Sequence, residues 1–143
     1  MLTKGSEYAI RALLYIQLQN WKEKRPGVIE IAREIEAPEA YTAKILHLLT
    51  SRDFLGSMKG RGGGFFYNDI QPERNLYDII VHLEGDRLFT NCGIGLKNCS
   101  DQDPCPLHNE FAKVRNELMK LFKNESIRSL AEKIRDGKAV LKL

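Results

Sequence analysis

Three cysteines and a histidine lie close together in one polar segment of this 143-residue chain. Their spacing is Cys92-x6-Cys99-x5-Cys105-x2-His108, and the intervening residues are rich in Gly, Asn, Ser and Asp. Buried structural cysteines normally sit among apolar neighbours. Thiolates in a polar loop are instead the soft ligands that zinc and iron–sulfur clusters require. Residues from about 90 to 107 therefore predict a metal-binding loop.

The spacing alone does not identify the metal. Structural zinc sites favour two close pairs of ligands with two to four residues between the members of each pair. Only the last pair, Cys105 and His108, is close here, and gaps of six and five residues suit a larger object such as an iron–sulfur cluster. Zinc, a cluster and free thiols all stay open at this point.

Upstream of the cysteines, two helical patterns indicate a helix-turn-helix. Apolar residues at i, i+3, i+4 and i+7 predict a helix over residues 28–36, and a helix over 38–52 follows the break at Ala37-Pro38. The second helix is about 20 Å long and fits a major groove. The apolar residues Tyr41, Ile45, Leu48 and Leu49 are expected to face inward on this helix. Thr42 is expected on the outer side, where it can hydrogen-bond a base edge or a phosphate. The expected DNA contacts from this helix are Tyr41, Thr42, Ala43, Lys44 and His47.

A glycine-rich hairpin follows the second helix. Strands are predicted over residues 54–59 and 65–68, and glycines tolerate the positive φ angles of a tight connection. Because no Gly-Lys-Ser/Thr follows, the glycines do not indicate a phosphate-binding loop of a nucleotide enzyme. The residues at the hairpin tip that we expect to contact phosphates or an adjacent minor groove are Lys59, Gly60, Arg61 and Gly62.

The last third of the chain contains a pattern typical of a helix that meets a partner helix. Apolar residues recur there every 3.5 residues for two heptads, although an ordinary core helix is the alternative. They are Leu107, Phe111, Val114, Leu118 and Leu121. We predict a mainly α-helical fold with a small β-hairpin wing. Residues 1–75 form a winged helix-turn-helix, and residues 76–143 form a linker helix, the cysteine loop, a long dimerisation helix and a C-terminal helix.

Composition excludes several other classes of protein. With 43% hydrophobic and 29% charged residues, the chain has the composition of an ordinary globular protein. The apolar stretch at residues 9–18 is too short, and too often interrupted, for a signal peptide or a membrane span. We therefore expect a cytoplasmic protein without membrane contact. No catalytic triad, carboxylate pair or cofactor-binding glycine motif is present, so no enzymatic activity is expected.

The whole chain resembles the Rrf-two family of winged-helix regulators. The resemblance rests on Leu2-Thr3-Lys4 and Tyr8-Ala9 near the start, on Ile31-Ala32, Tyr41 and Ile45-Leu46 in the reading head, on Lys59-Gly60-Arg61-Gly62-Gly63-Gly64-Phe65 in the wing, and on Cys105-Pro106-Leu107-His108. It implies a homodimer on double-stranded DNA with a roughly palindromic operator. It also implies an iron–sulfur cluster whose loss or modification changes DNA affinity.

The resemblance further implies which residues hold the cluster. Cys92, Cys99 and Cys105 correspond to the three cysteine ligands of cluster-binding relatives. Relatives with a 2Fe-2S centre use a histidine at the position of His108. The nitric-oxide sensors of the family use an acidic residue from the partner's first helix, at the position of Glu7. We favour a 2Fe-2S cluster with His108, with a 4Fe-4S cluster and Glu7 of the partner subunit as alternatives.

The leading hypothesis is a transcriptional regulator, expected to act as a repressor, whose operator affinity is controlled by the cluster. A regulator of the same fold that binds no cluster and senses a metabolite or thiol oxidation is the second hypothesis. A zinc-stabilised protein-interaction module is the third. Ala43 aligns with a glutamate that tunes operator specificity in the family, so the operator preference of those relatives is not transferred.

Overall fold

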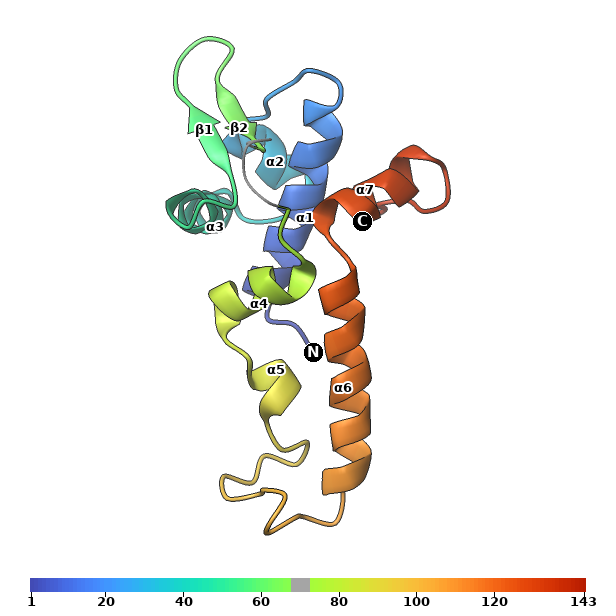
Figure 1. The fold of residues 1–143 in the computed structure, drawn as a ribbon. Coiled ribbons are helices and arrows are strands. Elements are labelled where there is room, and N and C mark those ends of the chain that lie inside the picture. Colours follow the sequence, from blue (N-terminus) through green and yellow to red (C-terminus); the bar gives the residue numbers. More distant parts are fainter. Residues whose placement is uncertain (68–72) are drawn as a thin grey trace.

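Seven α-helices and one two-stranded hairpin make up the described part of the chain, residues 1–67 and 73–143 of a computed structural model (Figure 1). This confirms the predicted mainly helical fold with a small β-hairpin. In chain order the elements are α1 (Lys4–Asn20), α2 (Val28–Glu34), α3 (Glu39–Ser51), β1 (Gly56–Met58), β2 (Gly64–Phe66), α4 (Leu76–Glu84), α5 (Arg87–Thr90), α6 (His108–Asn124) and α7 (Ile127–Arg135).

Helices α1, α2 and α3 pack around one apolar core. Helix α2 stops two residues earlier than predicted, because Glu36 adopts a positive φ of 52° and Pro38 prevents the helix from continuing. The backbone N–H of Ala37 donates to the Ala32 carbonyl at 3.0 Å and closes the turn before α3. The largest fully buried apolar side chains of this core are Leu13, Ile16, Ile31, Ile35, Leu46 and Leu49.

The hairpin is shorter than predicted and is supported by the segment between α1 and α2. Strands β1 and β2 pair antiparallel, with Ser57 opposite Phe65. An isolated two-stranded hairpin is marginal in water. Here the N–H of Phe65 donates to the Pro26 carbonyl at 2.9 Å. A Cβ at Gly64 would lie 2.2 Å from the Arg25 carbonyl oxygen, so only glycine permits this approach. The predicted strand end at Asn68 lies outside the described residues.

Helix α6 extends from the neighbourhood of α1 and α7 toward the end of the molecule that lies away from the hairpin (Figure 1). Phe89 of α5 packs between Tyr77 of α4 and Phe122 of α6, with ring centroids 4.9 and 5.9 Å apart. Helix α7 turns back onto α1, where the Arg135 guanidinium lies 4.7 Å from the centre of a Trp21 ring. The segment that joins α5 to α6 therefore lies at the opposite end of the molecule from the hairpin (Figure 1).

One row of apolar residues on α6 faces outward. Val114 is 63% exposed and Leu121 is 55% exposed, and Leu107, just before the helix, is 43% exposed. Leu118 instead packs against the core, and Phe111 is half-buried beside Gly93. The 3.5-residue pattern is thus divided between an inward row and an outward row spaced by seven residues.

Within the described ranges, no helix is both long enough and apolar enough to cross a membrane.

Candidate metal centre and nucleic-acid interface

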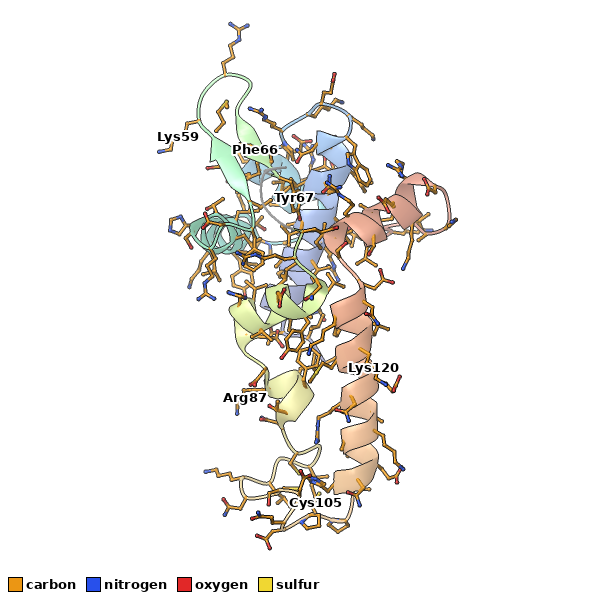
Figure 2. The ribbon with its side chains drawn as sticks, in the orientation of Figure 1. Lys59, Phe66, Tyr67, Arg87, Cys105 and Lys120 are labelled. Atoms are coloured by element: carbon orange, nitrogen blue, oxygen red, sulfur yellow. The ribbon has the colours of Figure 1, made fainter. Side chains whose placement is uncertain are left out.

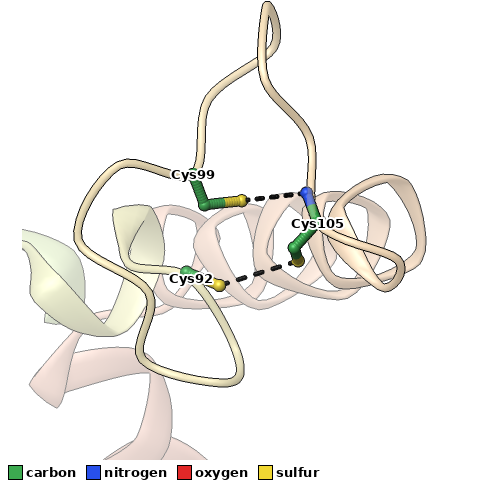
Figure 3. Close-up of side chains that lie close together, drawn as sticks. All are labelled: Cys92, Cys99 and Cys105. Carbon is green, nitrogen blue, oxygen red and sulfur yellow. Dashed lines mark hydrogen bonds between the residues drawn. The ribbon is translucent and has the colours of Figure 1, made fainter.

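The structure brings the three predicted cysteine ligands together in the loop between α5 and α6 (Figure 3). The Sγ atoms of Cys92, Cys99 and Cys105 all lie within 4.8 Å of one another. Those of Cys92 and Cys105 are 3.7 Å apart, and the backbone N–H of Cys105 donates to the Cys99 sulfur at 3.5 Å. Residues separated by up to thirteen positions thus converge on one point.

Backbone donors surround the first of these sulfurs. The N–H groups of Ile94 and Leu96 point at Cys92 and lower the pKa of its thiol to about 7. Gly95 has a φ of 77°, and its N–H donates to the Cys92 carbonyl at 3.0 Å, which closes this tight turn. Amide donors aimed at a sulfur stabilise its thiolate, which is the form that binds metals.

Cys99 has a different environment. The backbone N–H of Cys105 lowers the pKa of the Cys99 thiol, but partial burial and the two neighbouring cysteines raise it more, and the net direction is upward. The pKa values of the Cys92 and Cys99 thiols are therefore shifted in opposite directions. A bound cation would remove this difference, because a coordinating thiol is deprotonated outright.

His108 begins α6 and lies at the edge of the cysteine group. Its Nδ1 atom is 3.1 Å from the Cys99 sulfur, and its Nε2 atom is 2.8 Å from an Asp101 carboxylate oxygen. The histidine side chain is only 10% exposed. Among the described residues, the set whose ligand atoms all lie within 4.8 Å of one another comprises the cysteines without His108. His108 thus neighbours one sulfur rather than the centre of all three.

Glu7, the alternative fourth ligand, lies on α1 and is not in the cysteine group of its own chain. A hydrogen bond from Lys4, 2.8 Å away, lowers the pKa of the Glu7 carboxyl. The side chain keeps 32% of its surface exposed. It is therefore ionised and accessible from outside the chain.

The cysteine loop is held against α6 at its first residues. A Cβ on Gly93 would lie 2.4 Å from three atoms of the Phe111 ring, so the loop backbone lies directly on that ring. The Arg115 guanidinium donates to the Asn91 carbonyl at 2.9 Å. Both contacts flank Cys92, so the position of this sulfur depends on the position of α6.

The donor set fits a tetrahedral thiolate-bound metal centre. With a metal–sulfur bond of about 2.3 Å, two thiolates on one tetrahedral ion lie about 3.8 Å apart. The distance between the Cys92 and Cys105 sulfurs, 3.7 Å, agrees with this value. Three sulfurs and an imidazole are soft and borderline ligands, which suit iron–sulfur clusters and zinc.

At the other end of the molecule, two elements expose the residues predicted to contact DNA, with the exception of Thr42. The α3 residues Tyr41, Ala43, Lys44 and His47 are exposed. Lys59, Gly60, Arg61 and Gly62 are exposed on the hairpin, where Figure 2 shows the Lys59 side chain pointing away from the body of the protein. The edge of the Tyr41 ring packs on Tyr8 of α1, with centroids 5.8 Å apart.

The prediction that Thr42 lies on the outer face of α3 is wrong. Thr42 is fully buried, and its hydroxyl donates to the Pro38 carbonyl at 2.9 Å. Ile45 and Leu49 of the predicted stripe are buried, but Thr42 and Leu46 complete the stripe instead of Tyr41 and Leu48. The spacing i, i+3, i+4 and i+7 also fits the buried set, which is Thr42, Ile45, Leu46 and Leu49.

The unpredicted contacts in and near the site include those of the carboxylates Asp101 and Glu84. Asp101 contacts His108, and Glu84 at the end of α4 accepts a hydrogen bond from the Thr3 hydroxyl at 2.6 Å. Burial alone would raise the pKa of Glu84, but the hydrogen bonds from Ser6 and Thr3 outweigh burial and lower it. No sequence motif indicates either contact, because each depends on how a loop or chain end folds back.

Comparisons with known proteins agree with this arrangement. A family model described as "Rrf2: Iron-dependent Transcriptional regulator" matches residues 2–133. An HTH-type transcriptional regulator of Aquifex aeolicus (strain VF5) is 30% identical over 126 residues, which are 86% of this chain and 85% of that protein. The HTH-type transcriptional regulator NsrR of Oceanobacillus iheyensis is 27% identical over 130 residues, 90% of this chain and 88% of that protein.

Among solved structures, T. potens IscR has the same fold. It superposes with a TM-score of 0.73 at 16% identity, over 99% of this chain and 93% of that chain. This likeness confirms the predicted winged-helix architecture. Because the family model covers nearly the whole sequence and the Aquifex relative matches most of it, the chain belongs to the Rrf2 (Rrf-two) family of DNA-binding transcriptional regulators, which are not enzymes.

Proposed function

We propose that this protein is a repressor whose affinity for its operator is controlled by an iron–sulfur cluster bound in the loop between α5 and α6. The observation that carries the proposal is the convergence of three cysteine sulfurs within 4.8 Å in a loop that packs on α6. Cys92, Cys99 and Cys105 hold the cluster, with His108 as the favoured fourth ligand and Glu7 of the partner subunit as the alternative. A 2Fe-2S centre is favoured over a 4Fe-4S centre.

The working form is a homodimer on a roughly palindromic operator in cytoplasmic DNA. The outward row of Leu107, Val114 and Leu121 supports this proposal, because exposed leucines and valines spaced by seven residues suit packing against a second helix. Residues 1–75 act as the reading head, and residues 76–143 act as the sensing and dimerisation part. Replacing Val114 with Glu is expected to yield monomers in sedimentation experiments, since 63% of this side chain is exposed in the single chain.

The reading heads bind DNA through α3 and the hairpin. Lys44, Lys59 and Arg61 are exposed cations that neutralise phosphates, and Tyr41 and His47 are exposed on α3, where they line one surface depression with Lys44. Phosphate contacts position the protein, whereas side chains that reach base edges specify the sequence.

A bound cluster would supply metal–ligand bonds that fix the loop. Oxidants and iron supply would control whether the cluster is present and intact. Contacts between residues of the chain then connect the loop with the DNA-binding helix α3. Asn91 and Gly93 press the start of the loop onto Arg115 and Phe111 of α6, and α6 packs on α4 and α5. Arg52, at the end of α3, donates to the carbonyl of His82 in α4. A shift of α6 is thereby passed through α4 to the recognition helix.

A small energy difference is enough for this control. A preference of about 1 kcal/mol for one spacing of the two reading heads changes operator occupancy about fivefold. The cluster therefore needs only to bias the position of α6.

The test is anaerobic purification of the full chain, followed by iron and sulfide analysis and an absorption spectrum. We expect visible charge-transfer bands, and operator binding that differs between the loaded and the chelator-treated protein. Cys99→Ala is expected to abolish the bands, while Lys97→Ala in the same loop retains them. A colourless protein that binds neither iron nor sulfide after anaerobic reconstitution would overturn the proposal. Zinc in place of iron would instead support an interaction module.

The distance of 3.7 Å between the Cys92 and Cys105 sulfurs favours a second candidate function, the sensing of oxidants by the thiols themselves. Hydrogen peroxide would take two electrons from the two thiols, joining the sulfurs in a disulfide, while its O–O bond breaks and both thiol protons pass to the two water molecules formed. Peptide mass spectrometry after peroxide treatment separates the two candidates. A Cys92–Cys105 disulfide that changes operator affinity in a protein without iron supports the second one.

A further inference from the structure

The two ring nitrogens of His108 have different neighbours. Nε2 lies 2.8 Å from the Asp101 carboxylate, and Nδ1 lies 3.1 Å from the Cys99 sulfur. An ionised carboxylate only accepts hydrogen bonds, so Nε2 carries the proton. In the neutral imidazole the lone pair is then on Nδ1, the atom that faces the cysteines.

The surrounding structure leaves the imidazole little freedom. The N–H of His108 donates to the Cys105 carbonyl at 3.0 Å, which fixes the backbone at the start of α6. With only 10% of the side chain exposed, rotation of the ring meets protein on most sides. Because the position of the ring is already fixed, the contact with Asp101 determines which of its two nitrogens carries the proton.

A turn presents Asp101 to the histidine. The N–H of Ser100 donates to the Asp103 carbonyl at 3.2 Å, and the N–H of Asp103 donates to the Ser100 hydroxyl oxygen at 3.1 Å. Asp101 is one of the two residues between Ser100 and Asp103, and its side chain is 99% exposed except for its contact with His108. For the Asp103 carboxylate, no hydrogen bond or ion pair occurs among the described residues, so the two acids of one turn differ in role.

We propose that Asp101 is a positioning residue that fixes the tautomer of His108, so that Nδ1, and not Nε2, is the atom that binds the cluster. The inference rests on the proposed function and names an atom and a residue within that site. Metal-binding histidines commonly donate their second ring N–H to a carboxylate, which holds the ring and makes the ligand nitrogen more basic. A more basic nitrogen stabilises the oxidised cluster and lowers its reduction potential.

The ligand atom is identified by isotope labelling of the loaded full-length protein. Histidine carrying ¹⁵N only at Nδ1, or only at Nε2, is incorporated, and the reduced cluster is measured by pulsed electron paramagnetic resonance. We expect strong ¹⁵N coupling from the Nδ1 label and weak coupling from the Nε2 label. The reverse pattern, or no strong coupling from either label, overturns the inference.

Variants test the role of Asp101. Asp101→Ala is expected to raise the reduction potential and to release the cluster to a chelator several-fold faster, whereas Asp101→Glu restores both properties in part. Asp103→Asn is the matched control, because it removes the same charge from the same turn and should change neither. If Asp101→Ala and Asp103→Asn change the potential and the release rate to the same extent, the positioning role of Asp101 is refuted, whereas the proposal that the protein binds a cluster is not. A wild-type protein that forms no cluster would overturn both the inference and the proposed function.

Discussion

Replacing Gly93 with alanine should loosen the cysteine loop by a predictable amount. The new Cβ would lie 2.4 Å from three atoms of the Phe111 ring, about 1 Å inside the 3.4 Å at which ordinary contact begins. Either the ring or the backbone beside Cys92 must move. Overpacking of this kind costs about 1–3 kcal/mol, and the loop is displaced more easily than α6.

This cost falls mainly on the arrangement of the loop that we propose to bind the cluster, because the loop lies outside the main apolar core. At about 1.4 kcal/mol per factor of ten, the loaded Gly93→Ala protein should hold its cluster about 5- to 150-fold less tightly than the wild type. The assay is competition with an iron chelator under anaerobic conditions, followed by the visible absorption. Denaturant unfolding of the chelator-treated protein should change much less.

A second substitution checks the physical cause. Phe111→Leu removes the ring atoms that the new Cβ meets, so the double variant should recover most of the lost retention. Contacting residues give such non-additive effects, whereas distant ones do not. Equal retention in the wild type and Gly93→Ala, or a double variant that loses the sum of the two single losses, would refute the reasoning.

Three further predictions concern the reading head and its attachment. Arg61→Ala should flatten the dependence of log affinity on log salt by about 1.8, since each phosphate contact contributes about 0.9 and the proposed dimer has two copies of Arg61; an unchanged slope would remove the hairpin tip from the interface. Thr42→Val should lower the free energy of unfolding by about 0.5–1.5 kcal/mol without altering preference among operator sequences, whereas altered base preference in a binding selection would return Thr42 to the DNA surface. The depressed pKa of Glu84 gives stability that is present above its ordinary value of 4.5 and is lost as pH falls through its lower folded value. The unfolding free energies of wild type and Glu84→Gln should therefore differ most near neutral pH and converge in acid, and a difference that does not vary with pH would contradict this assignment.

Local patterns were sufficient to predict most of the architecture. The helical spacings over residues 28–36 and 38–52, and the glycines that follow, correctly predicted two helices and a hairpin in that order. The buried stripe of α3 was predicted wrongly at two of its four positions, where Thr42 and Leu46 are buried instead of Tyr41 and Leu48. Tyr41 and Thr42 both fit an apolar stripe by spacing, and only the packing of α3 on α1 and α2 decides which one is buried.

The site was predictable in composition but not in its contacts. The polar setting of Cys92, Cys99 and Cys105 indicated a shared ligand, and their sulfurs do converge. The pairing of Asp101 with His108 depends on a turn closed by Ser100, which no spacing rule indicates. Asp101 and Asp103 are the same residue type, so only the folded loop shows that Asp101 is the one that contacts His108.

The close approach of Pro26 to β2 has a consequence for behaviour in a crowded cell. A lone hairpin presents unpaired N–H and C=O groups along its two edges, and strands of other molecules can pair with such edges. The carbonyl of Pro26 occupies the N–H of Phe65, and proline has no amide hydrogen with which to continue a ladder. When several copies of this protein lie close together on DNA, the edge of the hairpin that faces Pro26 is therefore protected from pairing with a strand of a neighbouring copy.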